Sequence, residues 1–224
     1  MTCRRRAATP TVDMRSLTDF VLAELPRPSA RVLDVGCGAG DLARTMDGAG
    51  YEVVAIDPAA PDGEIFRRIK LDELDADERF DTVVAAFSLH HVTDLSVGLD
   101  RIRDVLRPGG LVLVEELGFD RLDQQTAEWF HGQRRALVAA GRMPAGPKTV
   151  AECRREWDDE HVGLHGADAM RSELAARFRQ RSFSWQPALY RYLDGVAAEA
   201  LERTLVEADA IQAIGFRYVG ERTA

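Results

Sequence analysis

The sequence predicts an α/β fold in which a mostly parallel sheet carries helices on both faces. Residues 32–40 read VLDVGCGAG, so an apolar run breaks into three glycines, and a helical pattern follows them. Apolar runs then alternate with helical patterns as far as Glu116. Alternation of this kind is typical of parallel strands joined by crossover helices. A Pro-Gly-Gly stop signal at 108–110 precedes the last of these apolar runs and marks the approach to a strand.

The first predicted helix follows a tail. Residues 1–12 contain Arg4-Arg5-Arg6 but no apolar core of a signal peptide, and we expect them to form a mobile tail. Residues 13–224 are expected to form a single domain. Asp13 is predicted to cap a first helix, which the prolines at 26 and 28 end.

The central part of the chain predicts five strands and the helices that link them. Each strand is an apolar run, and each helix has apolar residues at helical spacing. The strands are expected at 31–35, 52–56, 65–69, 81–86 and 111–116. The linking helices are expected at 39–47 and 95–106, and 107–110 is expected to be a turn.

The pattern changes after Glu116. Two helices are predicted at 120–141 and 148–158, separated by a loop rich in Gly and Pro. A helix at 167–178 then leads back to the sheet. The last two strands are expected at 182–190 and 215–220, antiparallel to each other, with a helix at 196–209 between them.

Composition limits the classes of function. The chain of 224 residues has a net charge of −8, whereas nucleic-acid binding requires a basic face. We therefore expect no nucleic-acid partner. No apolar stretch approaches the roughly 20 residues that cross a bilayer, so no membrane partner is expected. The three cysteines lie far apart in the sequence and predict reduced thiols in a cytoplasmic protein.

The glycine loop indicates the kind of ligand. Dinucleotide-binding loops read G-x-G-x-x-G, but the spacing here is D-x-G-x-G-x-G, with Asp34 two places before Gly36. A carboxylate at this place would repel a pyrophosphate and would suit a ligand with an ammonium group. Asp57 ends the next apolar run, where an α/β sheet usually holds a ribose by its hydroxyls.

Three ordered motifs together resemble those of class I S-adenosylmethionine-dependent methyltransferases of the small-molecule type. They are the glycine loop, the segment 80–92 and the segment 106–116. The resemblance implies a Rossmann-like, seven-stranded, mostly parallel sheet. It also implies S-adenosylmethionine as the cofactor and methyl transfer to an oxygen or nitrogen of a small-molecule acceptor. About 50 residues intervene where the family has one helix after the fifth strand, and long connections tend to be functional. We assign 118–165 to a helical lid insertion that covers the substrate.

The same resemblance assigns residues to the cofactor. Asp34 would act on its ammonium group, and Gly36 and Gly38 would let its methionine part approach the main chain. Asp57 would accept hydrogen bonds from both ribose hydroxyls.

Other residues of the same loops complete this assignment. Asp72, or Glu73 in its place, would contact the adenine amino group, and Cys37 would fill space in the glycine loop without acting as a nucleophile. The full set expected to bind the cofactor is Asp34, Gly36, Cys37, Gly38, Gly40, Asp57, Pro58, Leu71, Asp72, Ala86 and Phe87.

His90 and His91 are the candidate catalytic residues. They follow the fourth predicted strand, beside the place that the resemblance gives to the methyl group. An imidazole there could take a proton from the acceptor near neutral pH. The alternative is a scaffold role, in which a ring hydrogen-bonds the backbone and orders the loop, and this alternative is favoured for His91.

A second histidine pair closes the proposed insertion. His161 and His165 would share one face of a helix, but Gly163 lies between them and the sequence places no third ligand. No metal site is therefore expected. One of these histidines could instead enter the acceptor pocket, and a solvated loop end is the alternative.

Aromatic and basic residues of the second half are candidates for contacts with the acceptor. Trp129 or Trp157 is expected to line the acceptor pocket and Trp185 to lie in the core, because aromatic walls suit a flat apolar ligand. Arg134 and Arg135 could bind a substrate carboxylate or could form a solvated helix face.

Three rival functions stay open at this point. The same fold could bind the cofactor without methyl transfer, as a cyclase or a regulatory subunit. A nicotinamide-dependent oxidoreductase is opposed by the glycine spacing and by Asp34. The third is a methylase of protein or RNA. Its amino-methylating nucleic-acid class is opposed by the acidic composition and by residues 86–89, which read AFSL where that class carries an Asn-Pro-Pro-Tyr-type tetrapeptide. A homodimer also stays open, because no pattern fixes the oligomeric state.

Overall fold

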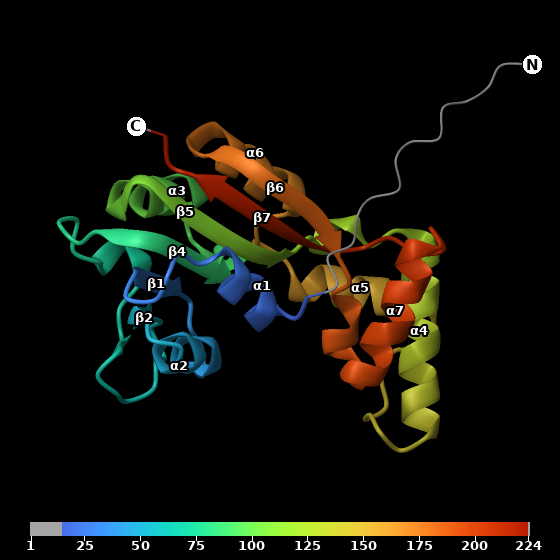
Figure 1. Cartoon of the computed structure of the whole chain (residues 1–224). Helices are drawn as coiled ribbons and strands as arrows, with labels where there is room; N and C mark the ends of the chain where they lie inside the picture. The colour runs from blue at the N-terminus through green and yellow to red at the C-terminus, as the bar shows by residue number, and fades with distance from the viewer. Residues whose placement is uncertain (1–14, 224) are drawn as a thin grey trace, which may run out of the picture. The chain divides into compact units, whose positions relative to one another are not determined.

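The computed structural model describes residues 15–223 and shows a sheet flanked by helices (Figure 1). The described residues form a seven-stranded sheet with the strand order β3-β2-β1-β4-β5-β7-β6. Its strands are β1 (Arg31–Val35), β2 (Glu52–Ile56), β3 (Phe66–Arg67), β4 (Phe80–Ala86), β5 (Leu106–Leu117), β6 (Arg179–Gln186) and β7 (Gly215–Glu221). The predicted N-terminal tail lies outside the described residues.

Most of the sheet is parallel. The pairs β1–β2, β1–β4, β2–β3 and β4–β5 are all parallel. β7 runs antiparallel to β5, because Gly118 N donates to Ile214 O near one end and Arg222 N donates to Gly110 O near the other. β6 is antiparallel to β7 as predicted, since Arg179 at the start of β6 pairs with Glu221 at the end of β7. The predicted seven-stranded, mostly parallel sheet is therefore confirmed.

The helices begin close to their predicted positions. They are α1 (Leu17–Glu24), α2 (Asp41–Gly48), α3 (Leu95–Val105), α4 (Gln124–Ala139), α5 (Val150–Glu160), α6 (Ala167–Arg177) and α7 (Val196–Glu207). The Ser16 hydroxyl accepts from Asp19 N at 3.1 Å and caps α1, whereas the predicted cap, Asp13, lies outside the described residues. Asp94 caps α3 in the same way, by accepting from Val97 N at 3.0 Å.

Several predicted boundaries were wrong. β3 is only Phe66–Arg67 where 65–69 was expected, and β6 begins at Arg179 where 182 was expected. The segment 107–110 is a bulged part of β5 and not a separate turn. Its backbone bonds the residue that follows β7: Gly109 N donates to Arg222 O at 2.9 Å. β6 ends at Gln186 and not at 190, because the buried Glu202 carboxylate accepts from the amides of Ala188 and Tyr190 and holds the chain in a short 3-10 helix.

The two faces of the sheet are covered by different helices (Figure 1). On one face, α1 and α2 bury Phe20, Val21 and Met46 against alternate residues of the strands. On the other, α3 and α6 contact each other, and Tyr218 of β7 donates to the carbonyl of Phe178 at 3.3 Å. Burial on both faces explains why the central strands are nearly continuous apolar runs.

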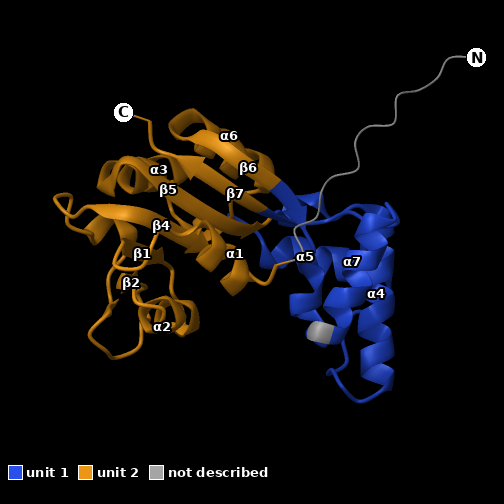
Figure 2. Ribbon diagram, in the orientation of Figure 1, with its two compact units in different colours: residues 1–13, 118–163, 184–216 blue, residues 14–117, 164–183, 217–224 orange. Residues whose placement is uncertain are grey.

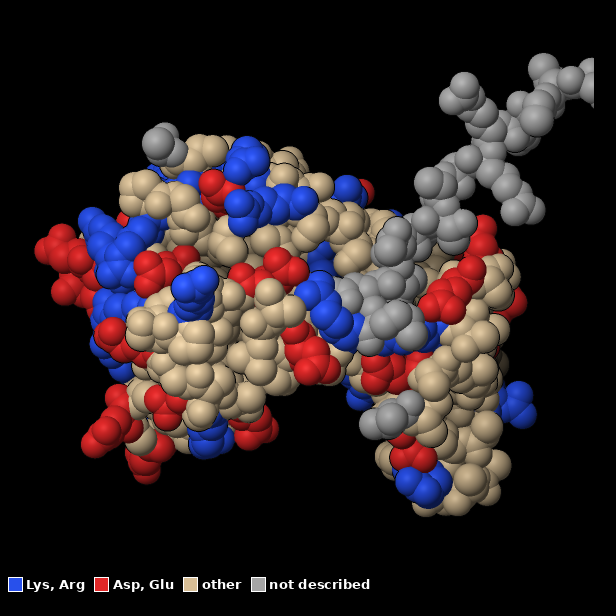
Figure 3. Space-filling model, in the orientation of Figure 1, with Lys and Arg blue, Asp and Glu red and all other residues tan. Residues whose placement is uncertain are grey.

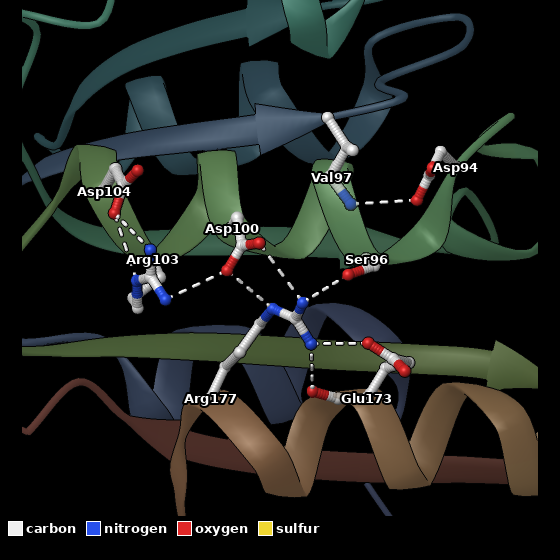
Figure 4. Close-up of polar contacts among 8 residues, drawn as sticks. All are labelled: Asp94, Ser96, Val97, Asp100, Arg103, Asp104, Glu173 and Arg177. Atoms are coloured by element: carbon white, nitrogen blue, oxygen red, sulfur yellow. Dashed lines mark hydrogen bonds and ion pairs between the residues drawn. The ribbon is translucent and has the colours of Figure 1, made fainter.

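Arg177 joins α6 to α3 (Figure 4). Its guanidinium donates to Asp100 at 2.9 Å, to the Ser96 hydroxyl at 2.6 Å and to Glu173 at 2.5 Å. The hydrogen bond from Arg177 lowers the pKa of Asp100 below its ordinary value. Because its bonds reach α3 and a neighbouring turn of α6, this one side chain fastens α6, which follows the proposed insertion, to α3.

The chain divides into two compact units (Figure 2). Unit 2 comprises 14–117, 164–183 and 217–224, and it contains β1 to β5 with α1, α2, α3 and α6. Among the described residues, unit 1 comprises 118–163 and 184–216, and it contains α4, α5 and α7. Unit 1 thus takes in most of the proposed insertion together with the chain around α7.

Among the described residues, no helix is long and apolar enough to cross a membrane. On the face of unit 2 shown in Figure 3, Lys and Arg side chains alternate with Asp and Glu side chains. Charged side chains of unit 2 also pair locally, as in the contact of Arg31 with Glu78 at 2.6 Å.

Candidate cofactor site

The candidate site lies where the order of the strands reverses. β1 lies between β2 and β4, and Val35 at its end is in register with Ile56 and with Ala85. Gly36, Asp57 and Ala86 therefore leave the sheet at the same edge. The carboxyl ends of parallel strands at such a reversal are the usual ligand site of an open α/β sheet.

The three glycines that follow β1 all have positive φ angles, but their surroundings differ. A Cβ atom at Gly36 (φ +72°) would lie 2.4 Å from Ser88 Cβ, and one at Gly40 (φ +84°) would lie 2.5 Å from the Phe66 ring. A Cβ atom at Gly38 (φ +51°) would meet nothing within 4 Å. Gly36 and Gly40 are thus required by contacts within the protein, and Gly38 borders open space.

Asp57 ties the end of β2 to the glycine loop. Its Oδ2 accepts from Gly38 N at 3.1 Å, and its Oδ1 accepts from Ala59 N at 2.7 Å. An ionised carboxylate has about four acceptor positions, so the half-buried group keeps capacity for two ligand hydroxyls. Pro58, which follows it, is exposed.

Asp34 is a buried carboxylate with an unused oxygen. The residue is 2% exposed, and among the described residues its Oδ2 has no hydrogen-bond partner. Burial, and then the negative charge of Asp57, raise the pKa of Asp34 to about 7. A cation beside this oxygen would remove the cost of ionisation, so the site is suited to a ligand with a positive charge.

The thiol of Cys37 is influenced by burial and by both carboxylates, Asp34 and Asp57. Burial, followed by the charges of Asp34 and Asp57, raises the pKa of the Cys37 thiol to about 12. The thiolate, which is the reactive form, is therefore disfavoured near neutral pH. This agrees with the predicted packing role.

The loop after β3 distinguishes Asp72 from Glu73. Leu71 is buried at the start of a 3-10 helix, Leu71–Glu73. Glu73 turns back to accept from Lys70 N at 2.7 Å, so its carboxylate caps this helix. Asp72 is exposed, which leaves it as the better candidate for contact with a ligand.

Glu116 organises the loop that follows β4. Its side chain is fully buried, and its Oε1 accepts from Ser88 N at 2.7 Å and from Leu89 N at 2.6 Å. Its Oε2 lies 2.5 Å from Nδ1 of His90. Just before this cluster, Phe87 has a φ of +52° and donates from its N–H to Glu115 O at 2.8 Å.

His90 and His91 occupy different environments. His90 is 7% exposed, and its Nδ1 is assigned as the donor to Glu116, which leaves Nε2 as the acceptor. His91 is exposed, and its ring centroid lies 4.1 Å from that of His90. His165 supports the same loop, because its N donates to His90 O at 3.2 Å and its Nε2 lies 2.8 Å from Val92 O.

His161 and His165 do not share one face of a helix. α5 ends at Glu160, so His161 and His165 lie beyond it. Among the described residues, no group of three His, Cys, Asp or Glu side chains could hold a metal ion. His161 lies 2.6 Å from Trp157 O through its Nδ1, and its ring stacks on Phe119.

The aromatic residues of unit 1 form a cluster of their own. Trp157 is 3% exposed, donates from Nε1 to Phe119 O at 3.0 Å and contacts the rings of Phe130 and Tyr192. Trp157 is thus a core residue of this unit. Trp129 and Trp185 are only partly buried and pack around Val206.

The two arginines of α4 also differ. Arg134 pairs with Glu156 at 2.5 Å, so its charge is already balanced within unit 1. Arg135 is exposed.

Sequence reasoning missed Glu116, Ser88 and Arg217. Arg217 donates from Nε to Glu115 Oε2 at 2.6 Å, and both side chains are buried. The available signal was the pair of carboxylates, Glu115 and Glu116, at the end of an otherwise apolar strand. Buried carboxylates need partners, but the sequence does not show where those partners come from.

A family model matches the chain over the segment that carries most of this site. Residues 5–145 match the family model described as a methyltransferase domain. A ubiquinone biosynthesis O-methyltransferase from Bradyrhizobium sp. (strain ORS 278) is 39% identical over 100 residues, which cover 39% of this chain and 40% of that protein. A malonyl-[acyl-carrier protein] O-methyltransferase from Pseudescherichia vulneris is 31% identical over 170 residues, which cover 70% of this chain and 67% of that protein.

The chain spans about two fifths of the length of the first curated relatives that it matches. Among solved structures, an S-adenosylmethionine-dependent methyltransferase from Mesorhizobium loti has a TM-score of 0.56 at 16% identity, over 91% of this chain and 96% of that one. At this identity the likeness is one of fold. Because the family model covers more than half of the sequence, the chain belongs to the methyltransferase domain family, and its fold is that of the class I S-adenosylmethionine-dependent methyltransferases.

Proposed function

We propose that this protein is a methyltransferase that uses S-adenosylmethionine to methylate an oxygen or nitrogen of a small-molecule acceptor. The observation that carries the proposal is the buried oxygen of Asp34, which has no hydrogen-bond partner in the described part of the chain and precedes a glycine loop that borders open space at Gly38. A buried carboxylate of this kind favours a cationic partner. The family match adds a second line of support.

The residues at the edge of the sheet fit the parts of this cofactor. Asp34 would bind its ammonium group, and Asp57 would bind its ribose hydroxyls. Leu71, Asp72 and Pro58 would contact the adenine. The main chain at Ala86 and Phe87, with Cys37 and the three glycines, would border the methionine part.

The bound cofactor would supply a methyl group on a positively charged sulfur. Transfer of this methyl group to the acceptor would leave a neutral thioether. The protein then has to align the acceptor with that methyl group, and alignment can contribute about 7–11 kcal/mol to lowering the barrier. A base is needed only where the acceptor atom carries a proton.

His90 is the residue that we assign to that base. The Nδ1 of its ring lies 2.5 Å from the buried Glu116 carboxylate, so the ring is oriented and its Nε2 is left to accept a proton. A carboxylate that fixes the tautomer of a histidine serves the same purpose in other enzymes. His91 would order the loop.

Two features support the choice of acceptor. The curated relatives reported above are O-methyltransferases by name, which favours oxygen as the target atom. We further propose that residues 118–165 select the acceptor as a substrate-covering insertion. The connection is long, and long connections tend to be functional. It also carries Trp129, which is only partly buried, and aromatic side chains suit a flat apolar molecule.

Turnover tests the proposal. The purified full chain is incubated with S-adenosylmethionine and a panel of phenols, carboxylic acids and amines, and S-adenosylhomocysteine is quantified. We expect acceptor-dependent formation of this product by the wild type and at least a hundredfold less by the Asp57→Ala variant. Cofactor binding with no product across the panel would favour the cyclase or regulatory alternative.

A further inference from the structure

Two buried polar atoms belong to residues near Gly36, one near it along the chain and one near it in space. Asp34 Oδ2 comes before it on β1, and Ser88 Oγ comes from the loop that follows β4. Among the described residues, neither atom has a hydrogen-bond partner. A buried polar group without a partner is costly, and native structures contain few of them. Each of these two atoms therefore requires a physical explanation.

The main chain of Ser88 is firmly held against the glycine loop. Its N–H and that of Leu89 both donate to the buried Glu116 carboxylate, at 2.7 Å and 2.6 Å. A Cβ atom at Gly36 would lie 2.4 Å from Ser88 Cβ and 3.2 Å from its Oγ. The hydroxyl group is thus placed directly beside Gly36.

The hydroxyl group can also change direction at little cost. Ser88 as a whole is partly exposed, although its Oγ is buried. A serine side chain has three staggered positions about its Cα–Cβ bond. Rotation between them moves the hydroxyl without moving the backbone that Glu116 holds.

The two atoms have complementary chemistry. The Asp34 carboxylate only accepts hydrogen bonds when ionised, and it attracts a positive group. The Ser88 hydroxyl can donate to a negative group. A ligand that presents an ammonium and a carboxylate on one carbon atom, as an α-amino acid does, would satisfy both atoms. We propose that the Ser88 hydroxyl donates a hydrogen bond to the carboxylate of the methionine part of the cofactor.

This assignment rests on the proposed function. It adds Ser88 as a residue that binds the carboxylate of the cofactor. It predicts that Ser88 distinguishes ligands with this carboxylate from ligands without it. S-adenosylhomocysteine and its decarboxylated analogue form a suitable pair, because the analogue keeps the nucleoside, the thioether and the ammonium group.

Calorimetry with these two ligands tests the assignment on the wild type and on Ser88→Ala. We expect Ser88→Ala to weaken the binding of S-adenosylhomocysteine by roughly tenfold or more, as for a lost hydrogen bond to a charged group. Binding of the decarboxylated analogue should change less than about twofold. The melting temperature of the ligand-free variant should not fall, because the hydroxyl removed has no partner among the described residues.

Thr82→Val is the matched control. Thr82 Oγ1 is also buried and, among the described residues, without a partner. It lies within β4, in register with Val32 and Leu111, and away from the glycine loop. Its replacement should leave the affinity for both ligands unchanged.

The possible failures are distinguishable. If the wild type bound neither ligand, the proposed function itself would be wrong. If the wild type bound S-adenosylhomocysteine but Ser88→Ala weakened both ligands equally, or weakened neither, the cofactor would bind without the assigned contact and only the role of Ser88 would be overturned.

Discussion

Gly38 N donates to Asp57 Oδ2 at 3.1 Å, so the tip of the glycine loop is fastened to the end of the neighbouring strand. The same carboxylate accepts from Ala59 N at 2.7 Å. Asp57 thus has two functions in this account: it holds the loop in place, and it offers its remaining lone pairs to the ribose.

Replacement of Asp57 tests the proposed contact with the ribose. Asp57→Ala removes every acceptor, and at about 1.5–3 kcal/mol for each hydrogen bond to a charged group, we expect the affinity for S-adenosylhomocysteine to fall by a hundredfold or more. Asp57→Asn keeps one oxygen of the same size and should lose less. Calorimetry measures both variants. A loss below threefold for the alanine variant would rule out ribose binding by Asp57.

Gly36 and Gly38 should respond differently to alanine. Gly36→Ala places a methyl group 2.4 Å from Ser88 Cβ, and overpacking costs typically about 1–3 kcal/mol. Gly38→Ala meets no atom within 4 Å, so it adds only backbone strain of about 1–2 kcal/mol.

We therefore expect Gly36→Ala to lower the melting temperature more than Gly38→Ala does. Gly38→Ala should fold and should still bind the cofactor poorly, because its methyl group enters the space that we assign to the ligand. Thermal melts and calorimetry on the two variants check this pair of expectations. Wild-type affinity in Gly38→Ala would place the ligand elsewhere.

Asp34 should make the ligand-free protein less stable as the pH rises. Its pKa is raised from 3.8 to about 7 in the folded protein, so between these values the folded state holds the proton that the unfolded state has lost. The free energy of unfolding then falls with rising pH, by roughly 4 kcal/mol in total from this group.

The variant Asp34→Asn removes this titration. Above about pH 7 it should melt at a higher temperature than the wild type, and the difference should shrink toward about pH 4. It should also bind S-adenosylhomocysteine weakly, because the ammonium group loses its anionic partner. Melting curves across this range provide the measurement. A variant that melts lower than the wild type above pH 7 would show that ionised Asp34 stabilises the unliganded fold.

His90→Gln tests the assignment of the base. General base catalysis contributes about a hundredfold to ten-thousandfold, so we expect the turnover of a hydroxyl acceptor to fall by a factor in this range. The affinity for S-adenosylhomocysteine should stay unchanged.

Glu116→Gln is the companion variant for His90. It disturbs the Nδ1 contact of His90 and the two amide contacts at Ser88 and Leu89, so both the rate and the melting temperature should fall. If His90→Gln kept the wild-type turnover of a hydroxyl acceptor, His90 would be a support of the loop and not the base.

The sequence predicted the parts of this site that depend on neighbours along the chain. The bounds of β1 and β2 were confirmed because their apolar runs end in a glycine and in a carboxylate. The strand–glycine–helix pattern likewise placed Asp34 and Asp57 at one edge of the sheet. Local chemistry was sufficient for both conclusions.

The remaining features depend on partners far away in the sequence. The segment 107–110 became part of β5 because it bonds Arg222 near the C-terminus. β6 ended early because Glu202 of α7 takes the amides that follow it. Glu116 and His90 lie 26 residues apart, and only the parallel pairing of β4 with β5 brings their loops together. Periodicity alone contains no information on these contacts.

A calorimetric titration of the full chain with S-adenosylhomocysteine, repeated with NADH, tests the central claim most directly. We predict saturable binding of S-adenosylhomocysteine at a single site, with affinity that weakens as the pH falls below about 7, because Asp34 takes up a proton, and no saturable binding of NADH. Binding of NADH in its place, or no heat with S-adenosylhomocysteine at millimolar concentration, would contradict the account.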